Sequence, residues 1–100
     1  MIAVGQTAAI NVPSIQTGTT ASANNPNRIG YQLQNVGTNP LYVLCGSGAS
    51  TTVYHALLKA ATSATSGDGG VFSMLQDTVY TGIITVAGTS PSYVVLELGN

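Results

Sequence analysis

Turn-forming residues interrupt this chain at short intervals along its whole length, and this spacing limits the folds available to it. Clusters of Gly, Asn, Asp, Ser and Pro separate short segments rich in Thr, Val, Ile and Tyr, which favour strands. Short strands with turn signals at a spacing of about 8–12 residues are typical of sandwiches and jelly rolls. The pattern therefore predicts an all-β fold, a small antiparallel β-sandwich or jelly-roll-like domain of about seven or eight short strands.

The most regular strand pattern covers Arg28 to Val36. Ile29, Tyr31 and Leu33 alternate with polar residues and glycine, so the period of two predicts that these three side chains face the core. Arg28 has the opposite parity. It is therefore expected to face outward.

A second clear strand is expected at Leu41 to Cys45, which is apolar on both of its faces. This pattern indicates a central strand covered on both sides, or a strand whose outer face meets a partner. Residues 37–40 read Gly-Thr-Asn-Pro and form a short turn sequence. We therefore expect the strands on either side of this turn to pair as an antiparallel hairpin.

Further strands are predicted at residues 71–75, 79–86 and 92–98. Gly82 is expected to weaken or bend the second of these. Residues 53–61 leave two alternatives open. Val53 and Tyr54 favour a strand, which we prefer, whereas the Ala- and Leu-rich remainder favours a short helix.

A chain of 100 residues is expected to form a single domain. Residues 1–23 hold short apolar pieces and a polar stretch, and we interpret them as an N-terminal arm with the first short strands. Residues 24–100 are expected to form the core of the β-sandwich. The arm is long enough to contact a neighbouring subunit.

Charged residues are scarce, since the chain has 2 Lys and Arg, 3 Asp and Glu, and a net charge of −1. Two cations cannot provide a phosphate-binding surface, which excludes nucleic-acid binding through a basic patch. No apolar run approaches the roughly 20 residues of a membrane-spanning helix, so no membrane contact is predicted. A surface with so little charge favours association, and the composition therefore indicates a component of an assembly.

Residues that support catalysis or bind metals are few and scattered. His55 is the only histidine and Cys45 the only cysteine, whereas a metal site needs several such ligands. No G-x-S-x-G sequence marks a nucleophile, and the acidic residues give no sign of a catalytic pair in a cleft. We therefore predict no enzymatic activity, no metal and no cofactor.

The residues predicted to contact other subunits come from the arm and from the strands. Tyr42 and Tyr54 lie outside the expected core, and tyrosine is enriched in protein interfaces, although stacking on a sugar ring is an alternative for them. Arg28 is expected to pair with Glu97 or Asp77, within the domain or across a subunit boundary. The complete set of predicted interface residues is Ile2, Val4, Arg28, Tyr42, Tyr54 and Glu97.

Four motifs combine strands and turns in a recognisable order. Residues 25–37 read N-P-N-R-I-G-Y-Q-L-Q-N-V-G, and residues 39–43 read N-P-L-Y-V. Residues 79–82 read V-Y-T-G, and residues 91–98 read P-S-Y-V-V-L-E-L. Together these motifs, which cover residues 24–98, resemble small virion proteins of tailed bacteriophages.

The resemblance implies a β-sandwich on the outside of a virion and brings no catalytic residues with it. We therefore expect a capsid decoration (cement) protein that binds the exterior of the shell and stabilises contacts between major capsid subunits. Its expected partners are the major capsid protein and copies of itself in a homotrimer, and it would be made in the host cytoplasm. The alternative is a head fibre, spike or tail component that binds a host-surface carbohydrate.

Overall fold

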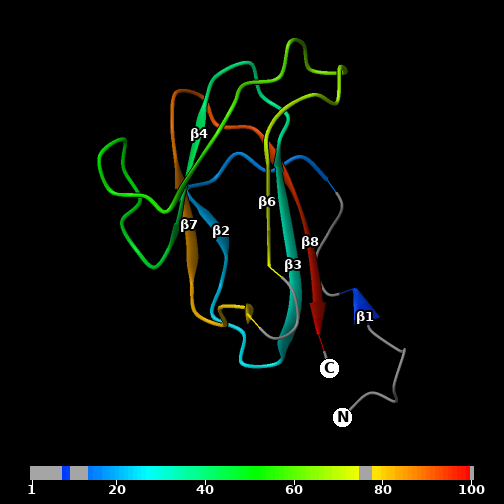
Figure 1. Cartoon of the computed structure of the whole chain (residues 1–100), viewed down its shortest axis with the longest axis vertical. Helices are drawn as coiled ribbons and strands as arrows, with labels where there is room; N and C mark the ends of the chain where they lie inside the picture. The colour runs from blue at the N-terminus through cyan, green and yellow to red at the C-terminus, as the bar shows by residue number, and fades with distance from the viewer. Residues whose placement is uncertain (1–7, 10–13, 75–77, 100) are drawn as a thin grey trace.

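The computed structural model describes residues 8–9, 14–74 and 78–99, and this part of the chain forms eight β-strands and no α-helix (Figure 1). Two four-stranded sheets pack face to face. The strands are β1 (Ala8–Ala9), β2 (Thr20–Ser22), β3 (Arg28–Asn35), β4 (Leu41–Cys45), β5 (Ala56–Leu58), β6 (Val71–Met74), β7 (Ile84–Ala87) and β8 (Tyr93–Gly99).

The order of the strands defines the topology. One sheet has the order β1-β8-β3-β6, the other has the order β2-β7-β4-β5, and neighbouring strands are antiparallel throughout. The chain crosses from one sheet to the other at every connection except β4–β5. This winding is that of a jelly roll, so the predicted all-β antiparallel sandwich is confirmed.

The core lies between the inner faces of the two sheets. Leu33 of the first sheet and Leu41 and Ile84 of the second are fully buried. Of the three residues predicted to face the core from the most regular strand, Tyr31 and Leu33 do so, whereas Ile29 is only half-buried. One apolar face per sheet is enough to form this core, as the period-two alternation indicates.

A β-bulge at the start of β3 overturns the prediction for Arg28. Arg28 is opposite Gly99 of β8 and Gly30 is opposite Leu98, so Ile29 is an extra residue on β3. One extra residue moves the side chain before it to the other face of the sheet. Arg28 therefore points into the sandwich and is 2% exposed, although uninterrupted alternation predicts that it faces outward.

The predicted hairpin between residues 28–36 and 41–45 is wrong, because its two strands lie in different sheets. The connection crosses between the sheets, and the backbone N–H groups of Val36 and Gly37 donate to the carbonyl oxygen of Ser92 instead of to β4. β4 lies between β5 and β7, which confirms its central position in the sheet. Its outward residues Tyr42 and Leu44 are only half-buried, so the expected cover on both faces is not found among the described residues, and a partner on the outer face stays a prediction.

The strand predicted over residues 79–86 is shorter than expected, since β7 begins only at Ile84. The residues before it form a loop that is bonded to Arg28. The carbonyl oxygens of Tyr80 and Gly82 accept hydrogen bonds from the guanidinium at 2.7 and 2.9 Å. Backbone groups bonded in this way are not available to a sheet.

The other predicted strands agree with the structure. The strand alternative is correct for the centre of residues 53–61, where β5 pairs with β4. The strands predicted at residues 71–75 and 92–98 correspond to β6 and β8, although Leu75 lies outside the described residues. In the predicted arm, β2 belongs to the second sheet and Gln16 forms a bridge with Tyr93 of β8. The division into an arm and a core stays a prediction.

Candidate functional site on two uncharged sheet faces

The described charged residues lie away from the outward faces of the two sheets. Arg28 and Glu97 are inside the sandwich, at 2% and 9% exposed. Lys59 follows β5 and Asp68 lies in the loop between β5 and β6, where both are exposed. In the described part of the chain, the side chains that point outward from the strands are therefore uncharged. Asp77 lies outside the described residues.

Arg28 and Glu97 form a buried ion pair, in which Arg28 Nε donates to Glu97 Oε2 at 2.6 Å. The side-chain amide of Asn25 donates to the same carboxylate oxygen at 3.3 Å. The pair connects the loop before β3 with the loop before β7, because Asn25 bonds to Glu97 and Arg28 bonds to Tyr80. A contact of Arg28 or Glu97 with another subunit stays a prediction. The remaining guanidinium nitrogens donate to backbone carbonyl oxygens, those of Ala23, Tyr80 and Gly82.

Tyr31 extends this polar interior along β3. Its hydroxyl lies 2.9 Å from the hydroxyl of Ser22, and its ring centroid lies 5.2 Å from the guanidinium carbon of Arg28. Desolvation by burial raises the pKa of Tyr31 to about 12. Every buried polar side-chain atom in the described residues has a hydrogen-bond partner. These groups therefore hold the fold together and leave no atom free for a ligand.

A second buried polar cluster surrounds Asn35 at the opposite end of β3, and it was not predicted. The Asn35 amide donates to the carbonyl oxygens of Asn39 and Lys59 at 2.9 and 3.1 Å, and its oxygen accepts from the N–H of Gly37 at 2.9 Å. Gly69 packs directly on Asn35, since a Cβ at Gly69 would lie 1.8 Å from the Asn35 carbonyl oxygen. The inward parity of Asn35 in the strand pattern is the signal that could have found it.

The first candidate surface is the outward side of β4 and β5, where Tyr42 and Tyr54 lie together. Their ring centroids are 4.9 Å apart and the rings meet edge to face at 67°. Leu57 is opposite Tyr42 in the β4–β5 pair and is 50% exposed, and Tyr54 is 41% exposed. We call Tyr42, Tyr54 and Leu57 the tyrosine face. The structure thus brings the two predicted tyrosines together, and their contact with a partner stays a prediction.

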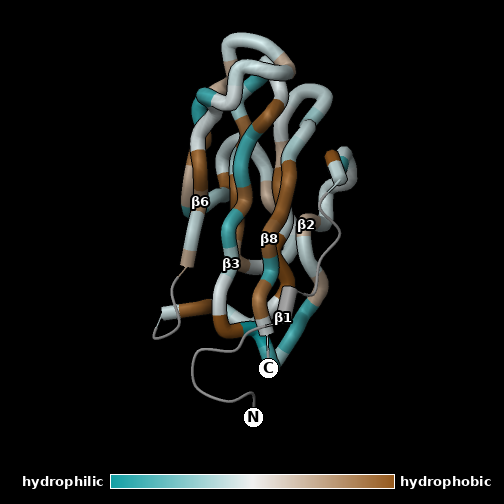
Figure 2. Tube along the Cα trace, turned by 90° about the vertical axis from the view of Figure 1, so that its right-hand side faces the viewer, coloured by the Kyte–Doolittle hydropathy of each residue, from teal (hydrophilic) through white to brown (hydrophobic). Residues whose placement is uncertain are grey.

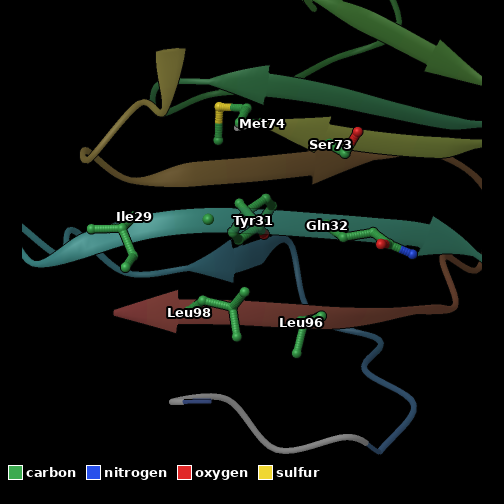
Figure 3. Close-up of a pocket in the computed structure, with 8 residues that line it drawn as sticks. Ile29, Tyr31, Gln32, Ser73, Met74, Leu96 and Leu98 are labelled. Carbon is green, nitrogen blue, oxygen red and sulfur yellow. The ribbon is translucent and has the colours of Figure 1, made fainter. Parts of the chain in front are cut away.

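The second candidate surface is a groove of about 330 Å³ on the outward side of β3, β6 and β8 (Figure 3). Leu96 and Leu98 project from β8 into it, and Gln32 and Ser73 add an amide and a hydroxyl. Gly30 leaves room beside Leu98, because a Cβ there would lie 3.2 Å from Leu98 Cδ1. Figure 2 shows the mainly apolar course of β8 on this side of the molecule. We call this surface the Leu96 groove.

Residues with catalytic or metal-binding chemistry do not meet in the described part of the chain. No group of three or more His, Cys, Asp or Glu residues there could hold a metal ion. His55 is exposed, and its Nδ1 accepts a hydrogen bond from the N–H of Cys45 at 3.1 Å. The Asp68 carboxylate accepts hydrogen bonds from the hydroxyl of Ser66 and from the hydroxyl and N–H of Thr62, which hold the pKa of Asp68 below its usual range. The absence of enzymatic activity and of a cofactor stays a prediction.

Two of the predicted interface residues, Ile2 and Val4, lie outside the described residues. Within the part of the chain that the structure describes, no helix is long and apolar enough to span a membrane. No protein-family model matches the chain, and no curated protein or solved structure was found to be similar to it. The tyrosine face and the Leu96 groove are two partly exposed apolar surfaces of the described residues.

Proposed function

We propose that this chain is a structural virion protein of a tailed bacteriophage, of the capsid decoration (cement) type. It would bind the exterior of the shell and stabilise contacts between major capsid subunits. The observation that carries the proposal is the distribution of charge, because the chain buries an ion pair and leaves its outward sheet faces uncharged in the described residues. Jelly rolls occur in viral capsid proteins, which supports the proposal at the level of the fold alone.

Uncharged faces with exposed apolar side chains favour contacts with protein. Burial of apolar surface contributes roughly 25 cal/mol per Å², and an uncharged face has no ion that must lose its hydration. Tyr54, Leu57 and Leu96 are 41%, 50% and 44% exposed. A partner that covers these side chains would therefore bury apolar surface that is in contact with water in the isolated domain. On a symmetric shell many such contacts act together, and each of them can be weak.

The proposal includes a homotrimer bound at positions of local threefold symmetry, where one trimer touches several major capsid subunits. A trimer presents each outward face three times, so a modest contact per copy is multiplied. The protein would be made in the host cytoplasm and would act on the exterior of the capsid.

The test compares phage particles with and without the protein. Removal is expected to lower the temperature at which particles release their DNA and to increase their sensitivity to low salt, and purified protein should restore both. A particle reconstruction should show copies spread over the whole shell. Unchanged particle stability would contradict the clamping role, and copies confined to a few vertices would point to a spike.

The tyrosine face favours a second candidate, a head fibre, spike or tail component that binds a host-surface carbohydrate. Tyr54 is 41% exposed and Tyr42 is half-buried, and a tyrosine ring combines an apolar face for a sugar ring with a hydroxyl for hydrogen bonds. In that case Tyr42→Ala and Tyr54→Ala should reduce adsorption to host cells and binding to a glycan array, whereas Leu96→Ala should not. Normal adsorption by both tyrosine variants would remove this candidate.

A further inference from the structure

We propose that residues Ile2–Val4 of one copy of this chain bind in the Leu96 groove of a second copy. The inference rests on the self-assembly that the proposed function includes, and it names the two surfaces that meet. Three features carry it: the lining of the groove, the position and direction of β1, and the absence of charged side chains on both sides of the contact.

The groove has the size and lining of a site for a short apolar segment. Its volume of about 330 Å³ lies at the lower end of the range of about 300–1,000 Å³ for small-molecule pockets, which is room for a few apolar side chains. Leu96 is 44% exposed in it, beside Ile29 and Leu98. The side chains of Gln32 and Ser73 are exposed and make no hydrogen bond to another described group, so both are available to the backbone of a bound segment.

β1 fixes the position and direction of the chain at Ala8. Ala8 is opposite Gly99 and Ala9 is opposite Leu98, in antiparallel pairing. At Ala8 the direction of the strand toward the N-terminus therefore points past the end of β8, and not across the sheet toward the groove of the same copy. Ile2 and Val4 are six and four residues before Ala8, so in an extended chain they can lie up to about 20 and 13 Å from it, which is enough to reach an adjacent molecule.

The chemistry of the segment matches that of the groove. In an extended segment Ile2 and Val4 project to the same side, as two apolar side chains spaced for neighbouring positions in the groove. Residues 1–7 contain no charged side chain, and no charged side chain lines the groove. A charged segment would lose its hydration there without gaining an ionic partner. Because each copy donates one segment and offers one groove, the contact is head to tail and can close into a ring such as a trimer.

A disulfide cross-link between two variants tests the contact directly. Val4→Cys and Leu96→Cys are made separately in a Cys45→Ser background, unfolded together, refolded as a mixture and oxidised. The proposal predicts a covalent dimer that contains one copy of each variant, identified by mass. In the matched control, Val71→Cys replaces Leu96→Cys, because Val71 is 49% exposed on the same sheet but lies outside the groove. That mixture should give only background cross-linking.

The oligomeric state provides an independent measurement on the full-length protein. Val4→Asp and Leu96→Asp should each raise the concentration needed for association by at least about tenfold, measured by sedimentation velocity. Ile15→Asp is the control, since Ile15 is 59% exposed and lies outside the groove. Urea unfolding of each variant checks that it is folded.

Two outcomes overturn the proposal. One is a wild-type protein that stays monomeric at every concentration tested. The other is a Val4→Cys/Leu96→Cys double variant whose disulfide forms only within single chains, which would mean that the segment binds the groove of its own copy. Binding to phage particles is measured separately, so a monomer that still binds the shell overturns this contact and leaves the proposed function standing.

Discussion

The inside of the sandwich holds the Arg28–Glu97 ion pair, whereas the outward faces hold exposed apolar side chains such as Leu57 and Leu96. Most soluble domains arrange these groups the other way, since charged side chains are rarely fully buried. The interior polar groups tie together loops that are distant in the sequence. The exposed apolar side chains Leu57 and Leu96 keep about half of their surface in contact with water in the isolated domain. Substitutions inside should therefore change folding, and substitutions on the faces should change association.

The largest effect is expected from breaking the interior ion pair. Arg28→Met leaves the Glu97 carboxylate buried without its partner and removes the bonds to the carbonyl oxygens of Tyr80 and Gly82. The free energy of unfolding, measured with urea, should fall by about 3–5 kcal/mol.

The double variant Arg28→Met/Glu97→Leu serves as the control for this prediction. It removes both charges and should be less destabilised than the sum of the two single variants, because no unpaired charge is left inside. If Arg28→Met lowered the free energy of unfolding by less than about 1 kcal/mol, the buried ion pair would stabilise the fold no more than a surface ion pair does. The contrast between the interior and the outward faces would then be wrong.

The buried phenol of Tyr31 should make the fold sensitive to alkaline pH. Its pKa is raised to about 12 by burial, whereas the unfolded chain has a tyrosine pKa of about 10. The folded state thus keeps a proton that the unfolded state loses, so this stabilisation is complete below pH 10 and is lost as the pH rises toward 12. The expected loss is about 2–3 kcal/mol, measured by urea unfolding across this range.

Tyr31→Phe isolates this contribution, since it removes the titrating group and leaves the ring in place. The variant should lose less stability between pH 10 and 12 than the wild type does. Equal losses of stability in the variant and the wild type would show that the pKa of Tyr31 is no higher in the folded protein than in the unfolded chain.

The contact between Gly69 and Asn35 predicts a smaller effect at the other end of the sandwich. A Cβ at Gly69 would lie 1.8 Å from the Asn35 carbonyl oxygen, so Gly69→Ala should destabilise the fold by about 1–3 kcal/mol. Gly18→Ala is the matched control, because no atom lies within 4 Å of a Cβ at Gly18. Equal stability of the two variants, measured by thermal unfolding, would contradict this packing.

The smallest effect on stability is expected on the tyrosine face. Leu57 is 50% exposed, and Leu57→Ser should change the free energy of unfolding by less than about 0.5 kcal/mol. A loss as large as that of an interior variant would show that this face already has a partner within the domain.

Period-two alternation was sufficient to predict the part of the fold that depends on one strand at a time. It placed Tyr31 and Leu33 in the core, whereas β4 was predicted to be central because residues 41–45 are apolar on both faces. The bulge at Ile29 was not predictable in this way, because it accompanies bonds between Arg28 and the distant loop before β7. The hairpin prediction failed for a similar reason, since short connections in a jelly roll join different sheets.

The candidate surfaces were predictable to a similar extent. Tyr42 and Tyr54 were identified because each lies outside the expected core in its own segment. Leu57 joins them only through the pairing of β4 with β5, and the Leu96 groove exists only where β3, β6 and β8 lie side by side. Cross-strand register is a property of the folded chain, and no single segment of the sequence contains it.

The central claim is that the uncharged faces are the surfaces of assembly, and binding to phage particles that lack the protein tests it most directly. Leu57→Asp and Leu96→Asp place a charge on one face each, and Thr65→Asp places the same charge in the exposed loop between β5 and β6. All three variants should stay within about 1 kcal/mol of the wild-type stability. The two face variants should lose binding to the particles while Thr65→Asp retains it. Wild-type binding by both face variants would contradict the claim.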